Sequence, residues 1–92
     1  MTIVWSQAAL RDLDEIAAYI ADTEPRAAQR VVERLMASVA TYSRFPGMGR
    51  IGPVDGTREI VVARLPYIIT YRVQVDVFEV LGIRHGAQQG PR

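Results

Sequence analysis

The beginning of the chain changes from a β-prone run to a helical spacing of its apolar residues. Residues 2–5 (TIVW) are β-prone, and Ser6 is a candidate helix N-cap because its hydroxyl can accept a hydrogen bond from a free amide of the first turn. From Gln7 onward the apolar positions recur with the helical period. Their stripe consists of Ala9, Leu13, Ile16 and Ile20, with Ala17 beside it. The pattern predicts a helix from Gln7 to a stop near residues 21–23.

A second helix is predicted to open at Glu24-Pro25, because proline suits a first helical position, where no amide partner is needed. Its core stripe consists of Ala28, Val32, Leu35, Val39 and Tyr42. Its outer face is charged and carries Arg26, Arg30, Glu33 and Arg34. Only a few residues separate the two helices, so we expect an antiparallel helical hairpin.

The second half of the chain predicts a loop followed by three strands. Residues 45–56 (FPGMGRIGPVDG) contain four glycines and two prolines, which is the composition of a loop. Three β-prone runs follow at residues 57–64, 67–75 and 77–84. The links between them are short, so neighbouring strands should pair as antiparallel hairpins. The tail, residues 85–92, has no periodicity and is expected to be loose.

These elements predict one α+β domain over residues 1–92, in the order β-α-α-β-β-β, with a helical hairpin packed on one face of an antiparallel sheet. In the middle strand, one apolar face should meet the helices; it consists of Tyr67, Ile69, Tyr71 and Val73. The opposite face carries Ile68, Thr70 and Arg72. Tyr19 and Tyr42 are also expected in the core or at its edge.

The last strand changes the parity of its apolar positions. Phe78 and Val80 share one face, whereas Leu81 and Ile83 share the other. A β-bulge would explain the change, and so would burial on both faces of the strand. The sequence pattern leaves both explanations open.

Composition excludes several classes of site. The chain has no cysteine and one histidine, so a disulfide framework or a thiolate metal site is excluded, and we expect neither metal nor cofactor. No apolar run reaches the length that spans a membrane, and the first residues lack the basic segment of a signal peptide. We therefore expect a cytoplasmic protein without membrane contacts.

The basic residues are unusual in kind and in distribution. All eleven are arginines, which suit interfaces and phosphates, although GC-rich coding would also favour them. Six of the ten acidic residues precede residue 41, whereas seven arginines and four acids follow it. The net charge of +1 is too small to indicate sequence-specific nucleic acid binding by the chain alone.

Several short motifs, taken together and in order, resemble the RelE/ParE superfamily of bacterial type II toxins. The motifs are W-S-x-x-A-x-x-D-L-x-x-I-x-x-Y-I (5–20), F-P-x-x-G-R (45–50), G-T-R-E (56–59), P-Y-I-I-x-Y-R-V (66–73) and I-R-H-G-A-Q (83–88). They span nearly the whole chain. The resemblance implies the two-layer fold predicted above and a cognate ParD-like antitoxin, whose C-terminal segment typically wraps the toxin as it folds.

The superfamily divides by activity. RelE-like members are described as ribosome-dependent mRNA endonucleases, and ParE-like members as poisons of DNA gyrase. Cleavage of RNA at a 2′-hydroxyl needs a base, an acid and cations around the phosphoryl transition state. RelE-like toxins supply these groups with lysines before the middle strand hairpin, an arginine early in the middle strand, a later arginine and a C-terminal tyrosine.

Carried onto this sequence, the nuclease set is missing. The lysine positions fall at about Glu59 and Val61, and the middle-strand arginine position falls at Ile68. The later arginine falls near Gly86, or at Arg84 if the alignment shifts, and no tyrosine follows Tyr71. The resemblance therefore favours the ParE branch, with DNA gyrase as the target. A RelE-like nuclease with a divergent site is the alternative, and an inert partner of the antitoxin is a third hypothesis.

The candidate functional residues are few. His85 could act as a base near neutral pH, or could be a surface residue that holds the chain end. Arg72 and Arg84 could form a partner-binding patch on the sheet with Arg58 and Arg64, or a solvated outer face. A loop arginine, Arg50, could bind an anion or connect the helices to the sheet.

Overall fold

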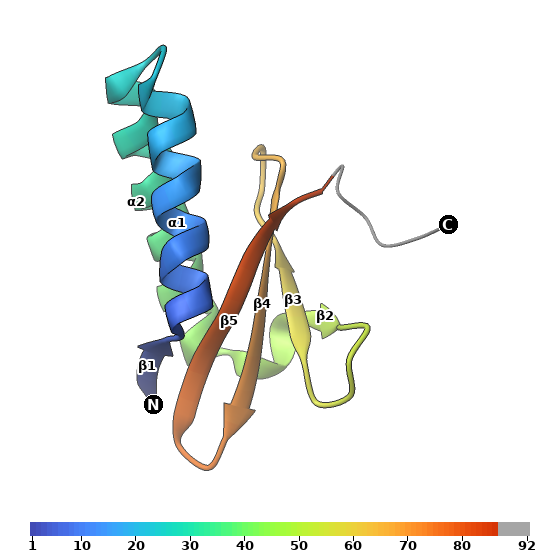
Figure 1. Cartoon of the computed structure of the whole chain (residues 1–92). Helices are drawn as coiled ribbons and strands as arrows, with labels where there is room; N and C mark the ends of the chain where they lie inside the picture. Colours follow the sequence, from blue (N-terminus) through green and yellow to red (C-terminus); the bar gives the residue numbers. More distant parts are fainter. Residues whose placement is uncertain (87–92) are drawn as a thin grey trace.

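The computed structural model describes residues 1–86 as a helical hairpin laid against one face of a twisted sheet (Figure 1). The elements in chain order are β1 (Thr2–Trp5), α1 (Gln7–Ala21), α2 (Pro25–Arg44), the short 3-10 helix η1 (Pro46–Met48), β2 (Arg50–Ile51), β3 (Arg58–Val61), β4 (Tyr67–Gln74) and β5 (Val77–His85). This is the α+β order that the sequence predicts, with one additional short strand.

Both helices begin where the sequence places them. The Ser6 hydroxyl accepts a hydrogen bond from the Ala9 amide at 3.0 Å, so it is the N-cap of α1. Pro25 occupies the first position of α2. The fully or nearly fully buried positions of the two helices are Ala9, Ala28, Leu35 and Val39. The helical hairpin is therefore held to the sheet by the stripes that the apolar period predicts.

The sheet has the strand order β1-β5-β4-β3-β2. The pairs β3–β4 and β4–β5 are antiparallel, as expected from the short links, and the additional strand β2 also pairs antiparallel with β3. The expectation of a purely antiparallel sheet is wrong at one edge, because β1 pairs with β5 in parallel, with Thr2 opposite Val77 and Trp5 opposite Val80. This pairing joins the two ends of the chain, so no local pattern could indicate it.

A β-bulge explains the parity change in the last strand. Thr70 lies opposite Gly82, but the next residue of β4, Tyr71, lies opposite Val80. Leu81 is therefore an extra residue with no opposite position in β4. Because of this shift, Ile83 returns to the helix-facing side, and it is buried together with Phe78 and Val80.

Tyr71 connects the core to the loop after α2. Its ring stacks on Phe78 with the ring centroids 4.3 Å apart. Its hydroxyl donates to the Pro46 carbonyl at 2.6 Å and accepts from the Gly49 amide at 3.1 Å. A Cβ atom at Gly49 would lie 2.3 Å from that hydroxyl oxygen, so the loop approaches the tyrosine more closely than a side chain would permit. The loop is thus fixed by the Tyr71 hydroxyl, which has both a hydrogen-bond acceptor and a donor in the loop.

The predicted faces of β4 agree with burial, with one addition. Tyr67, Ile69 and Tyr71 are buried in the core, whereas Arg72 is exposed on the opposite side. Ile68 also faces away from the helices, yet it is buried.

The chain end is more ordered at its start than expected. The loose tail was predicted from residue 85, but His85 belongs to β5, and the Gly86 amide donates to the Pro66 carbonyl. The remainder of the tail lies outside the described residues. No helix within residues 1–86 is long and apolar enough to cross a membrane.

Candidate protein-binding site

Two of the predicted arginines lie on the sheet face opposite the helices, here called the open face. Arg72 donates through Nε to Glu79 Oε1 at 2.9 Å. Arg84 donates through Nη1 to Glu59 Oε2 at 2.7 Å. Both are thus ion-paired within the chain, and part of their charge is already neutralised.

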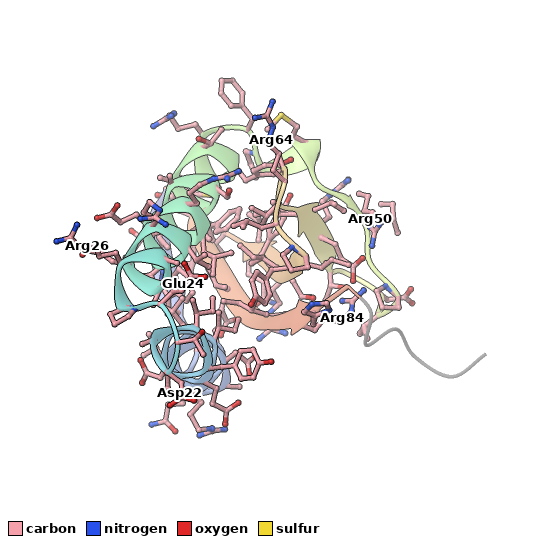
Figure 2. The ribbon with its side chains drawn as sticks, turned by 90° about the horizontal axis from the view of Figure 1, so that it is seen from above. Asp22, Glu24, Arg26, Arg50, Arg64 and Arg84 are labelled. Atoms are coloured by element: carbon pink, nitrogen blue, oxygen red, sulfur yellow. The ribbon has the colours of Figure 1, made fainter. Side chains whose placement is uncertain are left out.

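Glu59 is the centre of an ion triad on the open face. Its side chain is only 4% exposed, and its other carboxylate oxygen accepts from Arg50, with Nη2 at 2.8 Å and Nε at 2.9 Å. Burial by itself raises the pKa of the Glu59 carboxyl, but the hydrogen bonds and charges of Arg84 and Arg50 outweigh burial, so the pKa lies below its ordinary value. Figure 2 shows Arg50 and Arg84 beyond the sheet, away from Arg26 on α2.

The other two predicted arginines do not share this patch. Arg58 lies opposite Tyr71 in the β3–β4 register and donates to the Gly49 carbonyl at 2.7 Å. Arg64 lies exposed in the turn between β3 and β4, where its φ of 65° is left-handed. The open face therefore carries Arg72, Arg84 and Arg50 of β2, and of these Arg84 and Arg50 share one partner, Glu59. Sequence reasoning could not place Arg50 there, because β2 is too short to have a pattern.

The positions that would carry nuclease cations hold other groups. Glu59 is a buried carboxylate, and Val61 lies opposite Ile68 in the β3–β4 register. Two aliphatic side chains and an anion therefore stand where a RelE-like site needs positive charge for the phosphoryl transition state.

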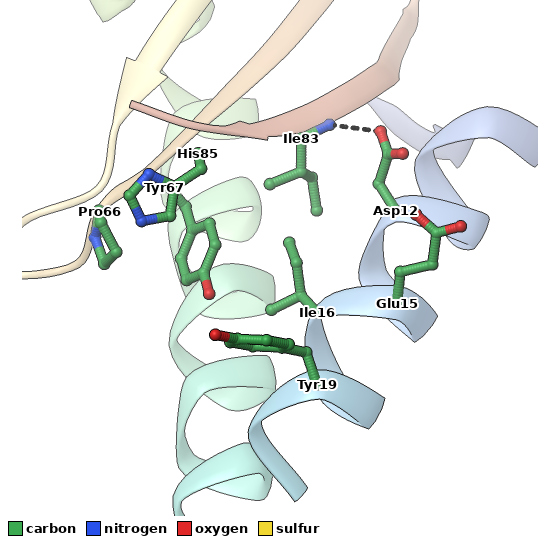
Figure 3. A pocket seen from close by; sticks show the side chains of 8 residues that line it. All are labelled: Asp12, Glu15, Ile16, Tyr19, Pro66, Tyr67, Ile83 and His85. Carbon is green, nitrogen blue, oxygen red and sulfur yellow. Dashed lines mark hydrogen bonds between the residues drawn. The ribbon is translucent and has the colours of Figure 1, made fainter. Parts of the chain in front are cut away.

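A groove opens between α1 and the ends of β4 and β5 (Figure 3). Its volume is about 720 Å³, within the range of ligand-binding pockets. It is lined by Asp12, Glu15, Ile16, Tyr19, Pro66, Tyr67, Ile83 and His85. Its floor is apolar, its α1 wall carries two carboxyl groups, and two tyrosines and a histidine add aromatic surface.

The α1 wall of the groove is fixed by contacts with the bulged part of β5. Within residues 1–86, β1 is the strand on the outer edge of β5, and it pairs only as far as Val80. Ser6 donates its hydroxyl to the Leu81 carbonyl at 3.1 Å, and the Asp12 carboxylate accepts from the Ile83 amide at 2.9 Å. Side chains of the first helical turns thus satisfy backbone groups that a neighbouring strand would otherwise pair.

His85 lines this groove instead of standing on the open face. Its ring meets the Tyr67 ring edge to face, with the centroids 5.7 Å apart. Asp12 and Glu15 line the same groove. Within residues 1–86, no group of three or more histidine or acidic side chains is arranged to hold a metal ion.

Tyr19 corrects an expectation from the sequence. It was assigned to the core or its edge, but its side chain is 81% exposed at the mouth of the groove. Tyr19 lies three residues after Ile16 and next to Ile20, and this helical spacing placed it near the apolar stripe of α1. Asp12 and Glu15 were likewise expected to be solvated helix charges, but both line the groove between α1 and the sheet.

Comparisons with known proteins agree on a family. The family model described as "ParE toxin of type II toxin-antitoxin system, parDE" matches residues 3–90. The chain is 48% identical over 90 residues to protein Y4kP of Sinorhizobium fredii, covering 98% of this chain and 93% of that protein. It is 37% identical over 86 residues to "Toxin RelE2" of Caulobacter vibrioides, covering 94% and 96%.

One solved structure, "Chromosomal ParDE TA system from P. aeruginosa", has the same fold with a TM-score of 0.84. The sequences are 26% identical, and the match covers 92% of this chain and 95% of that one. The superfamily inferred from the sequence motifs and the α+β fold predicted from the order of the elements are thereby confirmed.

Proposed function

Because the chain belongs to the ParE toxin family of type II toxin–antitoxin systems, we propose that it inhibits DNA gyrase by binding it, and that a ParD-type antitoxin neutralises it. The similarity to a ParDE structure supports the antitoxin as partner. The site of action is then the cytoplasm, where gyrase and the antitoxin meet the toxin.

The observation that carries the choice of target is the Arg50–Glu59–Arg84 triad. Glu59 stands at a position where a RelE-like nuclease needs a cation, and the two arginines around it are occupied by its carboxylate. Beside it the open face carries the exposed Val61 and, opposite it in the β3–β4 register, the buried Ile68, both of which are apolar. Such a surface suits binding to a protein better than stabilisation of a pentacovalent phosphate.

The second candidate is a ribosome-dependent mRNA endonuclease with a different set of residues. Two relatives from Caulobacter vibrioides, 37% and 33% identical to this chain, bear the names RelE2 and RelE1. In that case His85 would be the candidate base, because it lies in a groove rather than in the core.

A gyrase supercoiling assay separates the two. Purified toxin is added to gyrase and relaxed plasmid, alone and with the cognate antitoxin, and the same preparation is added to translating ribosomes. We expect supercoiling to stop and to resume when antitoxin is added, with the mRNA intact. Cleaved mRNA together with normal supercoiling would establish the nuclease and reject gyrase inhibition.

A further inference from the structure

The groove beside α1 leaves a large aromatic side chain uncovered. Tyr19 is 81% exposed, although the apolar side chains of Ile16, Tyr67 and Ile83 lie in the same groove. Figure 3 shows Tyr19 and Tyr67 extending from opposite walls into this space. Exposed tyrosines beside an apolar floor are frequent anchor points of protein interfaces.

The way in which the groove is built favours insertion of side chains over addition of a strand. At the bulge, the Leu81 carbonyl already accepts a hydrogen bond from the Ser6 hydroxyl, and the Ile83 amide already donates one to the Asp12 carboxylate. A partner strand would have to displace both contacts before it could pair with this part of β5. A partner that inserts side chains between α1 and β5 displaces neither.

The charge of the wall defines the kind of side chain. α1 carries Asp12, Asp14 and Glu15 against a single arginine, Arg11. Within residues 1–86, the acidic partners in ion pairs are Glu59 and Glu79. The three acids of α1 therefore have no ion-pair partner there. Two of the three, Asp12 and Glu15, line the groove. The wall therefore presents two carboxylates that have no ion pair within residues 1–86, next to the aromatic side chains of the groove.

We propose that this groove binds a lysine or arginine side chain of the antitoxin, presented next to an apolar residue. The aliphatic stem of the cation would lie on Ile16 and Ile83, and its head would pair with Glu15 beside the Tyr19 and Tyr67 rings. The apolar neighbour would cover Tyr19. This proposal rests on the proposed neutralisation by a ParD-type antitoxin. The antitoxin would bring a basic side chain to the groove, whereas the arginines of the open face would attract acidic side chains.

Affinity measurements between the full-length toxin and its cognate antitoxin test the charge. We expect Glu15→Lys to raise the Kd at least about tenfold, because it places the new lysine against the basic side chain of the antitoxin. Asp14→Lys is the matched control: it lies on the same helix, is exposed and does not line the groove. It should change the Kd by less than about threefold, since isolated surface charges contribute little.

A second pair of variants tests the aromatic contact without reversing a charge. Tyr19→Ala should weaken binding about tenfold or more, as expected for an interface anchor. Met36→Ala, an exposed apolar residue of α2 outside the groove, should have little effect. Unfolding by urea would verify that all four variants are folded, which their exposed positions favour.

Charge exchange with the antitoxin identifies the contact directly. Each lysine and arginine of the antitoxin is changed to glutamate in turn, and one such variant should restore binding to Glu15→Lys toxin about tenfold. If Glu15→Lys and Asp14→Lys have equal effects, or if no antitoxin variant restores binding, the proposal is wrong. Wild-type toxin that binds antitoxin but leaves gyrase active would reject the proposed target and leave this groove contact standing.

Discussion

The carboxylate of Asp12 accepts a hydrogen bond from the backbone amide of Ile83 at 2.9 Å, across a separation of 71 positions in the sequence. The bond joins the first half of α1 to the second residue after the bulge of β5. It closes a strand edge that β1 is too short to cover, and it sets one wall of the groove.

Replacement of Asp12 by alanine should destabilise the fold. The Ile83 amide would lose its acceptor at a partly buried position, which typically costs about 1–3 kcal/mol. Asp14→Ala, on the same helix but exposed, should cost less than about 0.5 kcal/mol. Urea unfolding of both variants measures the difference, and equal stabilities would mean that the bond contributes nothing.

The contact between Tyr71 and Gly49 predicts a coupled pair of substitutions. Tyr71→Phe removes the hydroxyl that contacts Pro46 and Gly49, with a loss of about 1–3 kcal/mol. Gly49→Ala places a Cβ atom 2.3 Å from that hydroxyl oxygen. In the double variant the oxygen is absent and the nearest atoms are ring carbons at 2.8 and 2.9 Å, so the loss should be smaller than the sum of the single losses. Thermal or urea unfolding of the four proteins measures the coupling, and strict additivity would contradict the close approach.

The triad predicts a dependence of stability on pH. The pKa of Glu59 is lower in the folded chain than its ordinary value of 4.5, because Arg84 and Arg50 outweigh the effect of burial. Its contribution to the free energy of unfolding is therefore fully present above that ordinary value and is lost as the pH falls through the folded pKa.

Glu59→Gln removes this titration. We expect wild type to lose more stability than Glu59→Gln when the pH is lowered from neutrality to well below 4.5. The measurement is the difference in the free energy of unfolding between the two pH values for each protein. Parallel losses would show that Glu59 does not titrate below its ordinary range.

The two arginines of the open face should differ in their structural cost. Arg84→Ala leaves the buried Glu59 carboxylate with one of its two arginine partners, which we expect to cost about 1–3 kcal/mol. Arg72→Ala breaks an exposed pair with Glu79, which is worth about 0–1 kcal/mol. Urea unfolding should rank them in this order, and a larger loss for Arg72→Ala would reverse the assignment.

Arg72→Ala is therefore the cleaner test of the arginine patch as a partner-binding surface. We expect it to weaken binding to the antitoxin or to gyrase without unfolding the chain, because Arg72 is exposed and paired at the surface. Titration of each partner against wild type and Arg72→Ala measures the effect. Unchanged affinity for both partners would assign Arg72 to the solvated face.

The candidate site could be predicted only in part. The sequence placed Arg72 on the face away from the helices because strand side chains alternate, and the structure has it there. For Arg84 the open face was one possibility only, because strict alternation puts it with Phe78 and Val80, and the bulge at Leu81 is what turns it to the open face. The sequence could not show that each arginine has an acidic partner, since Glu79 lies on the strand next to Arg72, and Glu59 lies on β3, two strands away from Arg84. Tyr19 was assigned to the core or its edge, but it is exposed. Its exposure depends on how far the sheet extends along α1, which the sequence does not show.

The sequence by itself determined the local elements: both helices with their starts, the two strand hairpins and the helix-facing side of β4. Helical period, the Ser6 cap, Pro25 and short links act between neighbouring residues, so their effect is readable along the chain. The motifs also determined the superfamily. Only the tertiary structure decided the parallel β1–β5 edge, the choice of a bulge at Leu81, the triad around Glu59 and the groove beside Asp12. Each of these depends on contacts between distant segments, whose energies are fixed only when the helices and the sheet are packed together.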